Sequence, residues 1–180
     1  MKSDLKRISK FLSLVLRHQP EKIGLTLDSQ GWANTQELLE KINKSGTALN
    51  LATLQEVVGN NNKKRFAFNP DGSKIRASQG HSIQIDLGYT PTQPPEFLYH
   101  GTATRFLESI QQDGLNKGAR HHVHLSKDLP TAKSVGGRHG VPVILTIKAQ
   151  AMFDDGCKFF VSVNGVWLTD SIPVKYIEFP

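Results

Sequence analysis

The stretch Tyr89-Thr90-Pro91-Thr92-Gln93-Pro94-Pro95 decides how this 180-residue chain is organised. Three prolines within five residues stop a helix and an interior strand, because proline fixes φ and lacks the amide donor. The hydrophobic content of 38% is enough for one sizeable core or two small ones. We therefore predict two lobes, residues 1–90 and 97–180, joined by a proline-rich linker over residues 91–96.

The segment before the linker is predicted to begin with three helices. Apolar residues at helical spacing indicate a first helix from Leu5 to about His18, and Pro20 prevents its continuation. Asn34 and Asn50 are placed to cap a second and a third helix, the second with a capping-box pattern completed by Glu37. A short extended stretch over residues 23–27 is expected between the first two helices.

A basic hairpin follows these helices. Residues 65–68 and 74–77 flank the turn Asn69-Pro70-Asp71-Gly72, and several of the flanking side chains are Lys or Arg. Three helices followed by a basic hairpin is the order of a winged-helix module, a common nucleic-acid binder. A fold alone does not establish a function.

The second half reads as mostly β with one or two helices, which makes the whole chain α+β. A helix around residues 105–112 is expected to end at Gly114, Met152–Cys157 is expected to form a turn into a strand, and Asn164-Gly165 signals a two-residue hairpin turn. Strands are expected at Phe97–His100, Val123–Ser126, Val141–Lys148, Phe159–Val163, Val166–Thr169 and Val174–Phe179.

The charge distribution favours a polyanionic partner. The net charge is +6, and residues 1–90 carry 13 Lys and Arg against 8 Asp and Glu. RNA or DNA is the obvious candidate, with an ordinary basic surface as the alternative. No signal peptide and no apolar run of membrane-spanning length is seen, so we expect a cytoplasmic protein without a membrane partner.

Several common chemistries lack their sequence signatures. No Gly-x-Gly-x-x-Gly follows a strand and no phosphate loop is present, so dinucleotide binding would not use a Rossmann fold. His122 and His124 would share one face of a strand, but a third ligand for a catalytic metal is missing. The lone Cys157 excludes a disulfide framework, and Ser126 lacks a nucleophile elbow. We expect no bound metal.

Three motifs together resemble those of the RNA 2′-phosphotransferase family, which is associated with the last step of tRNA splicing in fungi and plants. They are the run Ser9–Pro20 with its Arg17-His18 pair, the run Leu98–Thr102, and the segment Arg120–Ser126. Gly31-Trp32 and Gly114-Leu115 also fit. The resemblance covers nearly the whole chain, and the joint occurrence of the motifs is far more specific than any one of them.

The resemblance implies a winged-helix RNA-binding lobe followed by a mixed α/β lobe like that of ADP-ribosyltransferases. By motif match, the catalytic residues would be Arg17, His18, Arg65 and Arg120. Arg65 is the loosest of these matches, because Lys63 and Lys64 precede it. NAD⁺ would be bound by His100, Gly101, Thr102, Gly114, Leu115 and Ser126. Arg138 is either a phosphate contact or a surface charge.

The family resemblance also implies a reaction in which NAD⁺ is consumed as a co-substrate. The partner would be an RNA that carries an internal 2′-phosphate, such as a tRNA, and we expect a monomer. The RNA 2′-phosphate would first displace nicotinamide, giving an ADP-ribosylated RNA. The products would then be RNA with a free 2′-hydroxyl and ADP-ribose 1″,2″-cyclic phosphate. Arginine forks suit this chemistry because they grip phosphate oxygens in a bidentate way.

Other interpretations remain open for the same residues. His18 could simply complement the negative end of its helix, Arg65 could be a solvated wing residue, and residues 100–102 could be an ordinary strand-to-helix turn. The chain as a whole could be a nucleic-acid-binding module with a second lobe for a partner. It could also be an ADP-ribosyltransferase that modifies a terminal nucleic-acid phosphate or a protein, although the Glu-x-Glu and Gln-x-Glu pairs of protein-modifying enzymes are absent.

Overall fold

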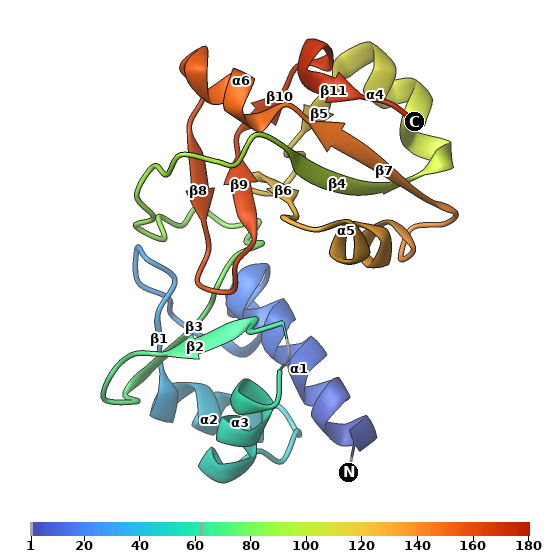
Figure 1. The fold of residues 1–180 in the computed structure, drawn as a ribbon. Helices are drawn as coiled ribbons and strands as arrows, with labels where there is room; N and C mark the ends of the chain where they lie inside the picture. Colours follow the sequence, from blue (N-terminus) through green and yellow to red (C-terminus); the bar gives the residue numbers. More distant parts are fainter. Residues whose placement is uncertain (1, 62) are drawn as a thin grey trace. The chain divides into compact units, whose positions relative to one another are not determined.

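The computed structural model describes residues 2–61 and 63–180 and forms two compact units, Met1–Gly88 and Tyr89–Pro180 (Figure 1). Each unit has its own buried apolar cluster. The chain mixes helices with small antiparallel sheets, as the sequence predicted at the level of fold class. The residues expected to form a linker belong to the second unit, where Pro94 is buried and the Thr92 amide donates to the Phe159 carbonyl at 2.8 Å.

Within residues 2–61 and 63–88, the first unit contains three α-helices, one short 3-10 helix and a three-stranded sheet in the order β1-β3-β2. Their bounds are α1 Lys2–Arg17, η1 Pro20–Ile23, β1 Ala33–Asn34, α2 Thr35–Lys44, α3 Leu51–Gly59, β2 Phe66–Phe68 and β3 Lys74–Ala77.

Helix α1 ends where the sequence predicted. Leu12, Val15 and Leu16 are fully buried on one face of it, as their helical spacing indicated. The expected extended stretch over residues 23–27 is wrong at its start, because Ile23 ends η1 and Gly24 turns the chain at φ 65°, a conformation that favours glycine. Residues 25–27 belong to no helix or strand.

Both predicted asparagine caps are present. The amide of Glu37 donates to Asn34 Oδ1 at 2.9 Å, and the amide of Thr53 donates to Asn50 Oδ1 at 2.8 Å. The side chain of Glu37 forms an ion pair with Lys41 at 2.9 Å, one turn farther along α2. The helix starts are therefore set by local side-chain chemistry that can be recognised in the sequence.

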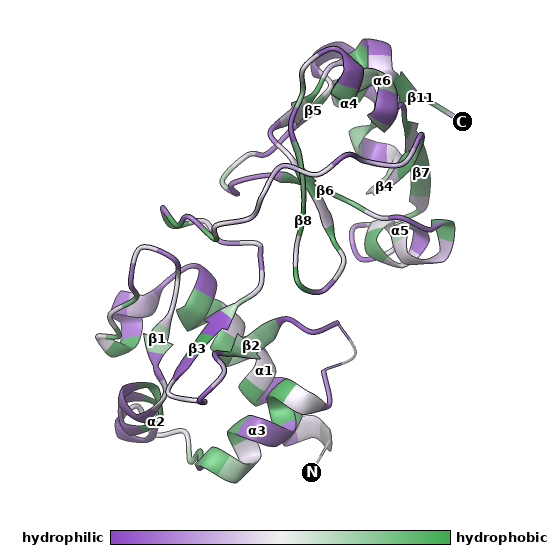
Figure 2. Cartoon of the chain, turned by 60° about the vertical axis from the view of Figure 1, so that its left-hand side comes forward, coloured by the Kyte–Doolittle hydropathy of each residue, from purple (hydrophilic) through white to green (hydrophobic). Residues whose placement is uncertain are grey.

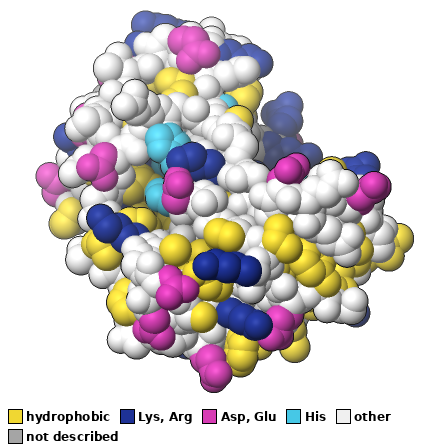
Figure 3. All heavy atoms as spheres, turned by 90° about the horizontal axis from the view of Figure 1, so that it is seen from above, with side chains coloured by type: hydrophobic (Ala, Val, Ile, Leu, Met, Phe, Trp, Pro, Cys, Tyr) yellow, Lys and Arg dark blue, Asp and Glu magenta, His cyan; other side chains and the backbone are white. Residues whose placement is uncertain are grey.

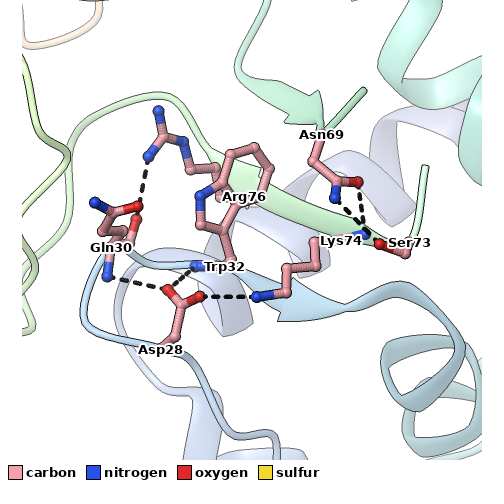
Figure 4. A network of polar contacts seen from close by, with 7 residues as sticks. All are labelled: Asp28, Gln30, Trp32, Asn69, Ser73, Lys74 and Arg76. Atoms are coloured by element: carbon pink, nitrogen blue, oxygen red, sulfur yellow. Dashed lines mark hydrogen bonds and ion pairs between the residues drawn. The ribbon is translucent and has the colours of Figure 1, made fainter. Parts of the chain in front are cut away.

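The predicted hairpin is confirmed, with Phe66 paired to Ala77 and Phe68 to Ile75. A polar network ties this hairpin to the turn that precedes β1 (Figure 4). Asp28 accepts hydrogen bonds from the amides of Gln30 and Trp32 and pairs with Lys74 at 3.3 Å. Burial alone would raise the pKa of Asp28, but these donors together lower it below its usual value.

The second unit contains three α-helices, two 3-10 helices and three small sheets, with the strand orders β11-β7-β4, β10-β5 and β6-β9-β8. Their bounds are β4 Leu98–Ala103, η2 Thr104–Phe106, α4 Leu107–Asp113, β5 Leu115–Asn116, β6 Val123–Leu125, α5 Leu129–Gly136, β7 Pro142–Ile147, α6 Ala149–Asp154, β8 Phe159–Val161, β9 Trp167–Thr169, β10 Ser171–Ile172, η3 Val174–Tyr176 and β11 Ile177–Glu178. Figure 2 shows β7, the central strand of its sheet, as largely hydrophobic, and its Leu145 and Ile147 belong to the buried core.

Strand β4 is longer than predicted. It runs through residues 101 and 102 to Ala103 and pairs with β7 over its whole length. Helix α5, which the sequence did not predict, packs against it so closely that a Cβ on Gly101 would lie 1.7 Å from the Ala132 carbonyl oxygen. A Cβ on Gly136 would likewise lie 2.5 Å from the Thr102 carbonyl oxygen. These two glycines let the helix and the strand pack backbone to backbone.

Two further expectations need correction. Met152 belongs to helix α6 rather than to a turn, although the chain does turn afterwards at Gly156, at φ 94°. The β8–β9 hairpin forms, but its loop has three residues, because the Ser162 amide donates to the Val166 carbonyl at 2.9 Å. Gly165 occupies the left-handed position of that loop at φ 78°.

Candidate functional site

The first unit brings the ends of three separate segments together. The Cζ atom of Arg17 lies 6.0 Å from the ring centroid of Phe66, the residue after Arg65. His18 Nδ1 lies 2.9 Å from the Ser82 hydroxyl, and the Ser82 amide donates to the Arg17 carbonyl at 3.0 Å. The C-terminal end of α1 and the start of β2, which carry the three N-terminal candidates, are therefore neighbours.

The backbone that leads to Arg65 is unusual. Lys64 has φ 41°, and it is the one residue other than glycine with positive φ in the described part of the chain. The Ser78 hydroxyl donates to the Lys64 carbonyl at 2.9 Å, and the Ser78 amide donates to the Arg65 carbonyl at 2.9 Å. Positive φ outside glycine persists where the surroundings hold it, and it is frequent at functional sites. Here the two hydrogen bonds donated by Ser78 hold the backbone of Lys64 in this conformation.

His100 is the best-defined candidate of the second unit. Its Nδ1 lies 3.0 Å from the His124 carbonyl oxygen. A carbonyl only accepts, so Nδ1 carries the proton and Nε2 keeps a lone pair. Burial lowers the pKa of His100; the His124 carbonyl opposes the shift and the nearby His139 adds to it. The ring is therefore a neutral acceptor at pH 7.

The neighbours of His100 lie inside β4, not at its end. Gly101 and Thr102 are both buried, Thr102 with 5% of its surface exposed. Gly101 has no room for a side chain because the backbone of α5 packs directly against it. The alternative interpretation of residues 100–102 as a strand-to-helix turn is wrong, because β4 continues to Ala103 and η2 begins at Thr104.

Three weaker candidates have structural roles. Gly114 caps α4 at φ 73°, and a Cβ there would lie 2.3 Å from the Ile172 carbonyl oxygen. Leu115 is buried in the core of the second unit. Ser126 is half-buried and forms a two-way backbone bridge with Tyr99, the amides donating at 2.8 and 2.9 Å. Ser126 is thus next to His100 in space.

Arg120 is exposed in a turn before β6, and its amide donates to the Lys117 carbonyl at 3.1 Å. Lys117 forms an ion pair with Asp170. Among the residues that the structure describes, no group of three His, Cys, Asp or Glu side chains could hold a metal. His122 is half-buried, and burial lowers its pKa, with smaller contributions in the same direction from His121 and Lys117.

Comparison with known proteins places these residues in a family. The family model described as "RNA 2'-phosphotransferase, Tpt1 / KptA family" matches residues 3–171. The chain belongs to this family. It is similar to a protein of Flavobacterium johnsoniae, with 62% identity over 174 residues, 97% of this chain and 96% of the relative.

More distant relatives carry the same name. A protein of Agrobacterium fabrum is 58% identical and covers 94% of this chain and 91% of its own, and one of an Escherichia coli strain is 51% identical and covers 97% and 96%. All three relatives are named "Probable RNA 2'-phosphotransferase". The resemblance stated from the sequence motifs is therefore confirmed at the level of the family.

The sequence reasoning missed the contacts that hold the candidates in place. Ser82 and Ser78 belong to no sequence motif, because a serine far along the chain can be matched to His18 or Arg65 only once the fold is known.

No helix in the described part of the chain is both long and apolar enough to cross a membrane.

Proposed function

We propose that this chain is an NAD⁺-dependent RNA 2′-phosphotransferase with a winged-helix RNA-binding unit and an ADP-ribosyltransferase-like unit. The observation that carries the proposal is the family match over residues 3–171, which includes all ten site candidates. The proposed RNA partner carries an internal 2′-phosphate, and NAD⁺ is the co-substrate. We also propose that the protein works as a monomer in the cytoplasm.

The state of His100 supports a role in binding NAD⁺. Its Nδ1 proton is engaged by the His124 carbonyl, so Nε2 can accept a hydrogen bond from a ribose hydroxyl. A neutral ring also avoids placing a positive charge beside the cationic nicotinamide ring. In this proposal Gly101, Gly114 and Leu115 shape the surroundings of the site, and Thr102 and Ser126 line it.

The arginines would handle the phosphate. The 2′-phosphate is already anionic when it attacks the ribose carbon and releases nicotinamide, so it needs positioning more than deprotonation. In the second step the 2″-hydroxyl of the transferred ADP-ribose attacks phosphorus and loses its proton, the bond to the RNA 2′-oxygen breaks and that oxygen takes up a proton, and ADP-ribose 1″,2″-cyclic phosphate leaves. Arg17, Arg65 and Arg120 would stabilise the charge on the phosphate oxygens, and His18 would assist proton transfer.

The contact between His18 and Ser82 fits this division of roles. The serine hydroxyl fixes one ring nitrogen at 2.9 Å, which leaves the orientation of the ring set before RNA binds. The stacking distance between Arg17 and Phe66 likewise limits where that guanidinium can lie. Pre-orientation of this kind is what phosphate recognition by forked side chains requires.

The experiment is incubation with NAD⁺ and an oligoribonucleotide that carries one internal 2′-phosphate, followed by mass spectrometry of the RNA. The proposal predicts conversion to the 2′-hydroxyl RNA, and Arg120→Ala should slow the second step more than the first, so that ADP-ribosylated RNA accumulates. Arg105→Ala, which changes an exposed arginine of the same unit, is the matched control. RNA that keeps its phosphate with the wild-type protein would refute the function, and a fully active Arg120→Ala variant would refute the residue assignment.

A further inference from the structure

The second unit contains a pocket that the proposed chemistry does not use. It lies at one end of the β6-β9-β8 sheet, has a volume of about 470 Å³, and is lined by His122, Gly156, Cys157, Lys158, Phe160, Thr169, Asp170 and Ser171. All of these residues belong to the second unit, so the pocket is complete within it.

The strand register places part of this lining on one face of the sheet. His124, Leu168 and Phe160 form one row across β6, β9 and β8. Extending the register by one residue puts His122 and Lys158 on either side of Asp170. Side chains two residues apart on a strand point to the same face. The face therefore carries two aromatic rings next to a cation and a carboxylate.

The aromatic pair gives the pocket its chemical character. The ring centroids of His122 and Phe160 are 5.5 Å apart and the rings are tilted by 57°. Burial keeps His122 neutral near pH 7, so it offers a π surface and a hydrogen-bond partner rather than a charge. The rim supplies polar groups from Lys158, Asp170 and Ser171. Aromatic faces with polar groups at the edges are what a nucleobase requires.

The pocket is tied to the turn that carries Arg120. Lys117 in that turn forms an ion pair with Asp170 at the pocket rim, and the Arg120 amide donates to the Lys117 carbonyl. Only one residue separates Arg120 from His122, so their Cα atoms are at most about 7 Å apart. A nucleotide whose phosphate is held by Arg120 would therefore have a neighbour within reach of the pocket.

Charge around the pocket also favours an RNA strand. Lys158 in the lining and Lys117 and Arg120 in the adjoining turn are exposed, and Asp170 is the one carboxylate among the lining residues. Figure 3 shows one face of the molecule on which histidine, basic and acidic side chains lie side by side. Single-stranded nucleic acids are bound by this combination of cations for the backbone and aromatic rings for the bases.

We infer that this pocket binds a nucleobase of the RNA substrate, that of a nucleotide next to the one bearing the 2′-phosphate, by stacking on Phe160, with His122 as a hydrogen-bond partner at the edge of the base. The inference rests on the proposed function for the identity of the RNA. It adds a base-binding subsite to the proposed phosphate site.

The test compares two hexaribonucleotides with one internal 2′-phosphate, one intact and one lacking the bases on both sides of the phosphorylated nucleotide. Phe160→Ala should raise the KM for the intact RNA about tenfold, toward the lower end of the loss of one base–aromatic stack. The kcat and the KM for NAD⁺ should not change, and neither should the KM for the RNA without flanking bases. Phe160→Tyr, which keeps the ring, should restore the wild-type KM. Phe106→Ala removes an exposed ring elsewhere in the same unit and should change nothing.

Two results would overturn the inference. One is an unchanged KM for the intact RNA in Phe160→Ala. The other is a raised KM for NAD⁺ alone, which would make the adenine of the dinucleotide the occupant. If the wild-type protein leaves the 2′-phosphate in place, the proposed function fails. Whether the pocket binds a nucleobase is then tested by comparing how tightly the wild-type protein and Phe160→Ala bind a fluorescein-labelled hexaribonucleotide without 2′-phosphate. Weaker binding by Phe160→Ala upholds the pocket, and equal binding overturns it.

Discussion

A single methyl group at Gly101 should be enough to displace helix α5. The added Cβ would lie 1.7 Å from the Ala132 carbonyl oxygen and 2.8 Å from the Gly136 amide nitrogen. Ordinary van der Waals contact begins near 3.4 Å. All the obstructing atoms are backbone, so the helix would have to move away by about 1.7 Å, the difference between these two distances, rather than a side chain rotating aside.

This clash sets the size of the expected effect. Overpacking that forces a backbone shift costs typically about 1–3 kcal/mol, and this case belongs in the upper half of that range. For a unit of roughly 90 residues, about 2–3 kcal/mol lowers the melting temperature by about 10–20 °C. Because Gly101 lies between His100 and Thr102, which we propose bind NAD⁺, the shift should also raise the KM for NAD⁺.

The chain offers a convenient probe for this measurement. It has two tryptophans, Trp32 in the first unit and Trp167 in the second, so a Trp32→Phe background makes Trp167 fluorescence report on the second unit alone. The matched control is Gly137→Ala, where the new Cβ lies 3.4 Å from the nearest atom and φ is −62°. That variant should stay within about 1 kcal/mol of the parent. A Gly101→Ala protein that melts within about 2 °C of its parent would refute the packing argument, since it would correspond to well under 1 kcal/mol.

Three further changes test other parts of the structure. The lowered pKa of His100 means that the unfolded chain takes up a proton there at a higher pH than the folded chain does. The second unit should therefore lose stability as the pH falls from 7 to 5, and thermal unfolding should show a smaller loss in His100→Asn. Asn34→Ala removes the acceptor for the Glu37 amide and should cost about 1 kcal/mol in chemical denaturation. Arg76 stacks on Trp32 at 4.4 Å, so Arg76→Lys should destabilise the first unit by about 1 kcal/mol and change Trp32 fluorescence.

Each of these three predictions has its own contradicting result. A pH profile that is identical in wild type and His100→Asn would mean that His100 is not held neutral by its surroundings. Asn60→Ala, at the C-terminal end of α3, serves as the control for Asn34→Ala, and equal losses in both would contradict the capping role. Full stability of Arg76→Lys would show that the stacked, forked geometry of arginine is not needed.

The elements that local chemistry determines could be predicted from the sequence. Asn34 and Asn50 cap the helices that they were expected to cap, and α1 ends before Pro20 as it must. The β2–β3 hairpin also formed at its predicted turn. Errors arose where a distant segment decides the outcome. Helix α5 depends on the missing side chains at Gly101 and Gly136, and neither glycine reveals its partner in the sequence.

The same contrast holds for the candidate site. The motif residues could be selected from the sequence, because Arg17-His18 and the run that ends at Ser126 resemble one family's signatures. Their physical state could not. That His100 is neutral with its proton on Nδ1 follows from the His124 carbonyl, which the fold brings to it. The pocket at Phe160 depends on the register of three strands, and strand pairing is not encoded locally.

The most direct test of the account is a count of products. The protein is incubated with NAD⁺ and an excess of RNA bearing an internal 2′-phosphate, and nicotinamide, ADP-ribose 1″,2″-cyclic phosphate and dephosphorylated RNA are each quantified over time. The account predicts that all three form in equal amounts, and that none forms when either NAD⁺ or the 2′-phosphate is left out. Loss of the phosphate without NAD⁺, or nicotinamide release without loss of the phosphate, would contradict it.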